Sequence, residues 1–60
     1  MSEYLTEREL AERYGLRSDT IKRWRKNGKG PAYHVIGGSV RYRKSDIEAY
    51  ERARRTEPAE

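Results

Sequence analysis

Residues 6–24, TERELAERYGLRSDTIKRW, predict two short helices that are joined by a tight turn. Thr6 and Glu9 have the spacing of a capping box, in which each side chain accepts a hydrogen bond from the other residue's backbone N–H. A first helix is therefore expected over residues 7–14. Gly15 ends it, because glycine readily adopts the left-handed conformation that follows many helices.

The second predicted helix runs from Ser18 to about Asn27, with either Ser18 or Arg17 at its cap. Ile21 and Trp24 are three residues apart and share its inward face. A helix, a short glycine-containing turn and a second helix form a helix-turn-helix arrangement. In this arrangement the second helix enters the major groove of DNA, so its outward face becomes the candidate reading surface.

Two β-prone segments, residues 33–36 and 40–43, follow a glycine- and proline-containing break and predict a hairpin. Either Gly37-Gly38 or Gly38-Ser39 fits the tight turn, so the register stays open. A second capping box over residues 45–48 then predicts a third helix from about Asp46 to Arg55.

The expected fold is mainly α with a β-hairpin, a winged helix-turn-helix that forms a single domain over residues 1–55. Residues 56–60, which include a proline and two acids, are expected to be a disordered tail. Trp24 is expected at the centre of the core because it is the largest apolar side chain. The other expected core residues are Leu5, Leu10, Tyr14, Leu16, Ile21, a hairpin valine or isoleucine, Tyr42, Ile47 and Tyr50.

Charge is unevenly distributed along the chain. Residues 17–44 contain nine basic residues and one acid, a net charge of +8, whereas the flanks contain five basic residues and nine acids, a net charge of −4. A basic middle between acidic flanks is typical of a protein that binds a polyanion. Composition alone fits a solvated charged surface equally well, so the interpretation depends on the helix-turn-helix arrangement.

The candidate DNA-binding residues divide between the second helix and the wing. Arg23 and Lys22 are the first choices in the major groove, since arginine can pair bidentately with guanine and lysine commonly holds phosphates. Asp19 either accepts from a cytosine amino group or neutralises the helix N-terminus, and we favour the second role. Arg41 is the first choice for the minor groove. The remaining candidates are Arg17, Ser18, Thr20, Lys26, Ser39 and Arg43.

Several other functions find no support in the sequence. The chain has no cysteine and one histidine, His34, so no metal site and no cofactor are expected. His34 lacks an obvious carboxylate partner and is expected on the hairpin surface. We expect no catalytic residues and no enzyme activity, because 60 residues leave little room for a closed pocket. No signal peptide or membrane-spanning run is evident, and the chain is expected to be cytoplasmic.

Two segments resemble a known group of DNA-binding domains. LAERYGL at residues 10–16 with TIKRW at 20–24 resembles the start of MerR-like and excisionase-type winged helix domains. IGGSVRYRKSDI at residues 36–47 resembles the wing and following helix of the same group. Arg17 departs from the pattern, since the group usually has a small capping hydroxyl there, and this makes Arg17 a candidate phosphate contact.

The resemblance implies a role for the protein. MerR regulators carry a long dimerisation helix and an effector domain after the wing, whereas this chain ends after one short helix. It therefore looks most like a phage excisionase, or recombination directionality factor, including those of mycobacteriophages. The group's properties imply binding to repeated sites in an attachment region, DNA bending, and help to a phage integrase in prophage excision. They also imply further copies of the protein along the DNA, in the nucleoid of a bacterial host.

Two alternatives remain open at this point. One is a small MerR- or AlpA-like transcriptional regulator that makes the same DNA contacts. The other is a protein-interaction module whose basic face binds an acidic partner.

Overall fold

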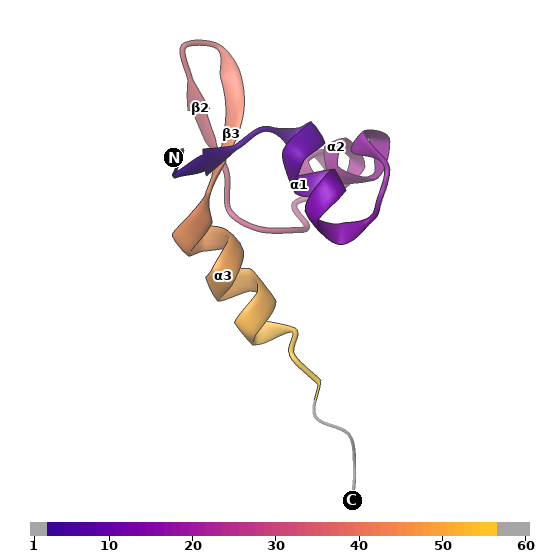
Figure 1. The fold of residues 1–60 in the computed structure, drawn as a ribbon. Coiled ribbons are helices and arrows are strands. Elements are labelled where there is room, and N and C mark those ends of the chain that lie inside the picture. Colours follow the sequence, from indigo (N-terminus) through magenta and orange to yellow (C-terminus); the bar gives the residue numbers. More distant parts are fainter. Residues whose placement is uncertain (1–2, 57–60) are drawn as a thin grey trace, which may run out of the picture.

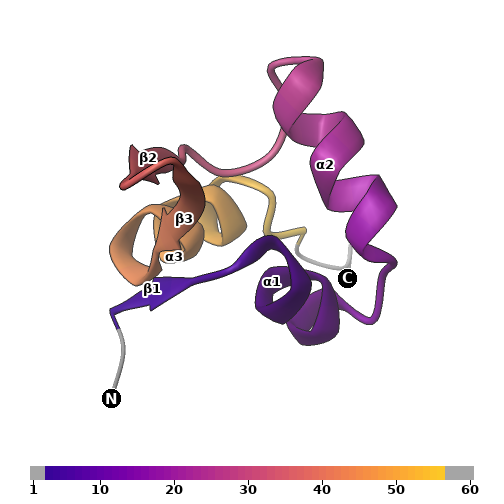
Figure 2. The ribbon, with the colours of Figure 1, turned by 90° about the horizontal axis from the view of Figure 1, so that it is seen from above.

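A computed structural model describes residues 3–56 of the chain. A β-hairpin projects from one side of the molecule, α3 extends away from the hairpin, and α1 and α2 lie together beside them (Figures 1 and 2). The elements in chain order are β1 (Tyr4–Leu5), α1 (Glu7–Tyr14), α2 (Ser18–Lys26), β2 (His34–Ile36), β3 (Ser39–Arg43) and α3 (Lys44–Ala53).

The predicted capping box forms at the start of α1. The backbone N–H of Thr6 donates to Glu9 Oε1 at 2.9 Å, and the N–H of Glu9 donates to Thr6 Oγ1 at 3.0 Å. The helix ends at Gly15, which has a φ of +66°. Local signals therefore determine both ends of this helix, as the sequence predicted.

The cap of α2 is Arg17 rather than Ser18. Arg17 is extended, with φ −83° and ψ 149°, and its side chain makes no capping hydrogen bond. Its carbonyl oxygen accepts from the backbone N–H of Thr20 at 3.0 Å. The helix ends at Lys26, and Asn27 forms its C-cap one residue earlier than the sequence suggested.

The strands form a three-stranded antiparallel sheet in the order β1-β3-β2. In the hairpin Val35 lies opposite Val40 and Ile36 lies opposite Ser39, so Gly37 and Gly38 make the turn. Both glycines have positive φ, 59° and 80°, as a two-residue type I′ turn requires. The register that the sequence left open is thereby settled. The short strand β1, which we did not predict, pairs with the other edge of β3.

The predicted capping box at residues 45–48 is wrong. Strand β3 leads directly into α3 at Lys44, with Arg43 as a cap that makes no side-chain hydrogen bond. The backbone N–H of Lys44 donates instead to the carbonyl oxygen of Glu3 at 2.8 Å. The chain before β1 therefore satisfies the start of α3, and the helix ends at Ala53 rather than Arg55.

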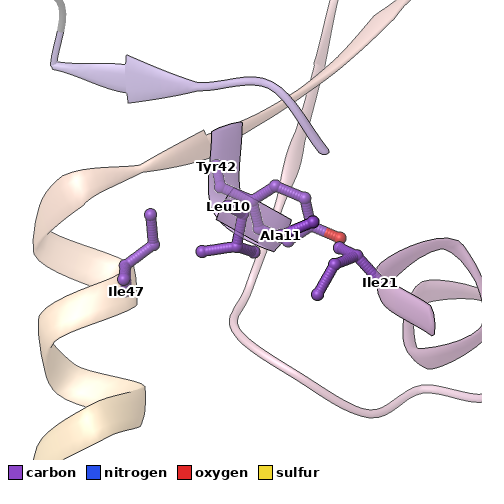
Figure 3. Packing of buried hydrophobic residues seen from close by; sticks show 5 residues of the cluster. All are labelled: Leu10, Ala11, Ile21, Tyr42 and Ile47. Carbon is purple, nitrogen blue, oxygen red and sulfur yellow. The ribbon is translucent and has the colours of Figure 1, made fainter. Parts of the chain in front are cut away.

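Five hydrophobic side chains form the core, and Figure 3 shows them converging from α1, α2, β3 and α3. They are Leu10, Ala11, Ile21, Tyr42 and Ile47. Leu5, Tyr14, Trp24 and Val40 are partly buried against them.

Two core predictions are wrong. Trp24 is only half-buried and lies at the edge of the core, with its ring 6.3 Å from the ring of Tyr14 and 6.1 Å from that of Tyr50. Tyr42 takes the central place, 1% exposed, because β3 is the middle strand and lies over α1. Leu16 in the α1–α2 turn is 41% exposed.

The observed architecture is the expected winged helix-turn-helix. The boundary of the domain at residue 55 stays a prediction. Of the predicted disordered tail, residues 57–60 lie outside the described part of the chain, and Thr56 follows α3 outside any helix.

Candidate nucleic-acid interface

The outward face of α2 carries the residues predicted to enter the major groove. Ile21 is fully buried and fixes the inward side of the helix. Asp19, Lys22, Arg23 and Lys26 are exposed, and together with Asn27 they line a shallow open hollow along the helix. The structure therefore brings four of the predicted residues together on one accessible surface.

The N-terminal end of α2 adds a smaller group of predicted residues. Arg17 and Ser18 are exposed, whereas Thr20 is half-buried. Backbone N–H groups at a helix N-terminus attract anions. Asp19, in the first turn, supplies negative charge at this end.

The electrostatics of this region favour a polyanion. Residues 20–45 contain eight basic residues and no acid. This stretch includes most of α2, the following loop and the whole hairpin. A ligand that contacts both α2 and the hairpin thus meets basic side chains from both elements, with no acidic residue between them in the sequence.

Arg25 is the basic residue of α2 that turns inward. Its Nε donates to Glu7 Oε2 at 2.6 Å, and about four-fifths of each side chain is buried. The guanidinium carbon also lies 5.9 Å from the centre of the Tyr33 ring. Arg25 therefore connects α1, α2 and the loop before β2. Its position four residues after Ile21 is the sequence signal that identifies its side of the helix.

The hairpin places its predicted residues on one face of the sheet. Arg41 lies opposite His34, and Arg43 lies opposite Tyr4 at the base of the hairpin. Arg41 is half-buried, and its Nη1 donates to the carbonyl oxygen of Val40 at 2.8 Å. Arg43 is exposed and Ser39 is half-buried. This placement agrees with the predicted alternation of arginine and apolar residues along β3.

His34 has a carboxylate partner, contrary to the sequence-based expectation. Its Nε2 lies 3.2 Å from Asp46 Oδ2, and its ring meets the ring of Tyr4 edge-on at 6.0 Å. The pair connects β2 to the first turn of α3. The two residues are 12 apart in sequence, and only the antiparallel sheet brings them together. His34 is nonetheless exposed on the hairpin, as predicted.

A bidentate ion pair holds α3 against α1. Arg13 Nε and Nη2 donate to the two carboxylate oxygens of Glu51 at 2.7 and 2.9 Å. The hydrogen bond from Arg13 lowers the pKa of Glu51 to about 2. Burial of the Tyr14 hydroxyl, followed by the neighbouring Glu51 carboxylate, raises the pKa of Tyr14. This cluster fastens the end of α3 that lies far from the hairpin.

Other kinds of site are not evident in residues 3–56. No group of three or more histidine and acidic side chains is placed to hold a metal ion in this part of the chain. No helix of the described chain is long and apolar enough to cross a membrane.

A glycine-linked helix pair, an exposed basic second helix and a hairpin wing together define a DNA-binding winged helix-turn-helix domain. Residues 4–55 match the model of a family described as a helix-turn-helix domain, and the chain belongs to this family. The protein is thus a small helix-turn-helix DNA-binding protein, and domains of this family are typically not enzymes. No curated protein matches the chain.

Proposed function

We propose that the protein is an architectural factor that binds and bends attachment-site DNA and thereby promotes prophage excision by a phage integrase. The observation that supports this role is the acid-free basic segment, residues 20–45, which links the outward face of α2 to the wing. A protein that holds DNA at two places can stabilise a bent duplex, because the additional contacts offset the cost of bending.

In this proposal α2 lies in the major groove. An α-helix with its side chains is about 10–12 Å across, and the groove is roughly 12 Å wide. Arg23 and Lys22 reach base edges or phosphates, and Lys26 contacts the backbone further along the helix. Arg17 and Ser18 contact a phosphate at the helix N-terminus, and Thr20 is a further contact there. Asp19 partly neutralises the positive charge of this helix end.

The wing lies in the adjacent minor groove. Arg41 and Arg43 supply its positive charge, and Ser39 lies beside the glycine turn. Arginine is well suited to this groove, because a narrow minor groove has an enhanced negative potential. Further copies of the protein on neighbouring sites would extend the bent region.

A transcriptional regulator of the same fold would use the same contacts, so the distinguishing experiment measures recombination. Excision of an attachment-site substrate by the cognate integrase is compared with and without the protein. Increased excision is the expected result. Unchanged excision together with altered activity of a neighbouring promoter would favour the regulator.

The interface itself is tested with Arg23→Ala, with Arg52→Ala on exposed α3 as the matched control. Loss of a base contact should weaken binding to a selected duplex by about 1–3 kcal/mol. The logarithm of the association constant should also fall linearly with the logarithm of the salt concentration, with a slope of about −0.9 per phosphate neutralised. Equal losses for Arg23→Ala and Arg52→Ala, or binding that is insensitive to salt, would argue against this interface and favour a protein-interaction module.

A further inference from the structure

The wing carries the two most exposed large aliphatic side chains among the described residues. Val35 is 65% exposed and Ile36 is 49% exposed, whereas the hydrophobic core of the described residues consists of five buried side chains. The exposed part of such a side chain gains nothing from burial when the protein folds, and apolar surface set among polar residues can mark a binding site. The apolar surface of this strand is therefore available to a ligand.

The hairpin register places the two side chains on opposite faces of the wing. Val35 lies opposite Val40, which packs toward the core, so Val35 extends from the sheet face that covers the helices. Ile36 lies opposite Ser39 and extends from the other face. The turn that follows is Gly37-Gly38, and a Cβ added to either glycine would have no neighbour within 4 Å. The wing thus ends in a narrow tip with apolar flanks.

The residues around this tip favour a binding partner whose surface combines apolar walls with negative charge. The hairpin has no acidic residue, and it continues the basic segment that begins in α2. Arg41 lies behind the tip on the same face as Ile36. The minor groove of DNA meets this description, since it has sugar and base-edge walls between two phosphate backbones.

We propose that the tip of the wing is an apolar wedge that enters the minor groove, where Ile36 and Val35 separate a base step and bend the duplex. Apolar side chains at such steps partially unstack the bases and kink DNA toward the major groove. Pyrimidine–purine steps are the preferred targets, because they unstack most easily. This proposal rests on the proposed DNA-binding function and adds the residues that cause the bend.

The test compares wild type with the double variant Val35→Thr/Ile36→Thr. Threonine keeps the β-branched shape that favours a strand, but it puts a hydroxyl in place of a methyl group of Val35 and of the ethyl group of Ile36. The probe is a 30-base-pair duplex recovered by selection with the wild-type protein. It carries a fluorophore at each end and 2-aminopurine in the step beneath the wing. Energy transfer reports the bend, and 2-aminopurine emission reports unstacking.

The double variant is expected to bind with an unchanged salt slope, while its bend and its 2-aminopurine signal fall below half of the wild-type values. Arg41→Gln is the matched control within the wing. The magnitude of its salt slope should fall by about 0.9, since one positive charge is removed from the interface, and unstacking should persist. A double variant that bends and unstacks the duplex as wild type does would overturn the proposal.

Two further outcomes separate this proposal from its alternatives. Strand β2 forms an edge of the sheet, and an edge strand can pair with a second copy. Sedimentation of wild type as a dimer without DNA, and of the double variant as a monomer, would therefore overturn the wedge in favour of self-association. If wild type binds no selected duplex at all, the proposed function fails and the wedge fails with it.

Discussion

Replacement of Gly30 by alanine should destabilise the protein through a contact with Trp24. Gly30 has a φ of +84°, and an added Cβ would lie 3.0 Å from Trp24 Cε3 and 3.3 Å from Trp24 Cβ. The indole cannot easily move aside, because the rings of Tyr14 and Tyr50 both contact it. The new methyl group therefore meets a side chain that is already held on other sides.

The expected magnitude combines three effects. The left-handed conformation costs a residue with a side chain about 1–2 kcal/mol. Crowding against a packed ring adds about 1–2 kcal/mol, which lies within the usual range for overpacking. Alanine also restricts the unfolded chain, and this stabilises the protein by about 0.4–1 kcal/mol. The net loss for Gly30→Ala is thus about 2–3 kcal/mol, a large share of the stability of so small a domain.

Gly28→Ala is the matched control. Gly28 also has a positive φ, +70°, but an added Cβ would have no neighbour within 4 Å. Its loss should be confined to the backbone effects, about 1 kcal/mol. Urea unfolding followed by the fluorescence of Trp24, the sole tryptophan, measures both variants. Losses that agree within about 0.5 kcal/mol, the scatter with which the effects of independent substitutions usually add, would refute the role assigned to the Trp24 contact.

Two more predictions concern the ion pairs. Arg25→Gln and Glu7→Gln should each lower the melting temperature. The double variant should melt no lower than the less stable of the two single variants, because both changes break the same 2.6 Å hydrogen bond. The salt slope of DNA binding should be unchanged in Arg25→Gln; a decrease of about 0.9 would instead identify a phosphate contact. Since the pKa of Glu51 is lowered to about 2, its pairing with Arg13 stabilises the protein above pH 4.5 and is lost as the pH falls toward 2. The side chain of Glu51 is one-third exposed, so urea unfolding should show a loss below about 1 kcal/mol that Arg13→Gln abolishes.

Local sequence signals predicted the first half of the fold well. The capping box at Thr6 and the glycine at position 15 act within one helical turn, so no distant residue was needed to interpret them. The start of α3 was predicted wrongly because it depends on a hydrogen bond between Lys44 and Glu3, which are far apart in sequence. Side-chain size suggested Trp24 for the centre of the core. Tyr42 lies there because strand order, not size, determines which residue is central.

The candidate site was predictable where one helix face determined it. Burial of Ile21 implies that Lys22, Arg23 and Lys26 face outward, and the structure agrees. Exposure of Val35 and Ile36 was not predictable, because alternation along a strand indicates which face a residue is on but not how far the hairpin extends beyond the helices. The pairing of His34 with Asp46 likewise depends on the sheet register.

The spacing between α2 and the wing depends on few contacts. Helix α2 is fastened to the core by Ile21, and β3 is fastened by Tyr42, with Leu10 and Ala11 of α1 in the same cluster. Outside the core, Arg25 joins α2 to Glu7 at the start of α1 and approaches Tyr33 just before β2. Because α1 takes part in both connections, a change at the start of α1 should alter the position of α2 relative to the wing without touching either of the proposed DNA-binding surfaces. If the proposed bending requires both surfaces at a fixed separation, such a change should reduce bending more than it reduces contact by α2 alone.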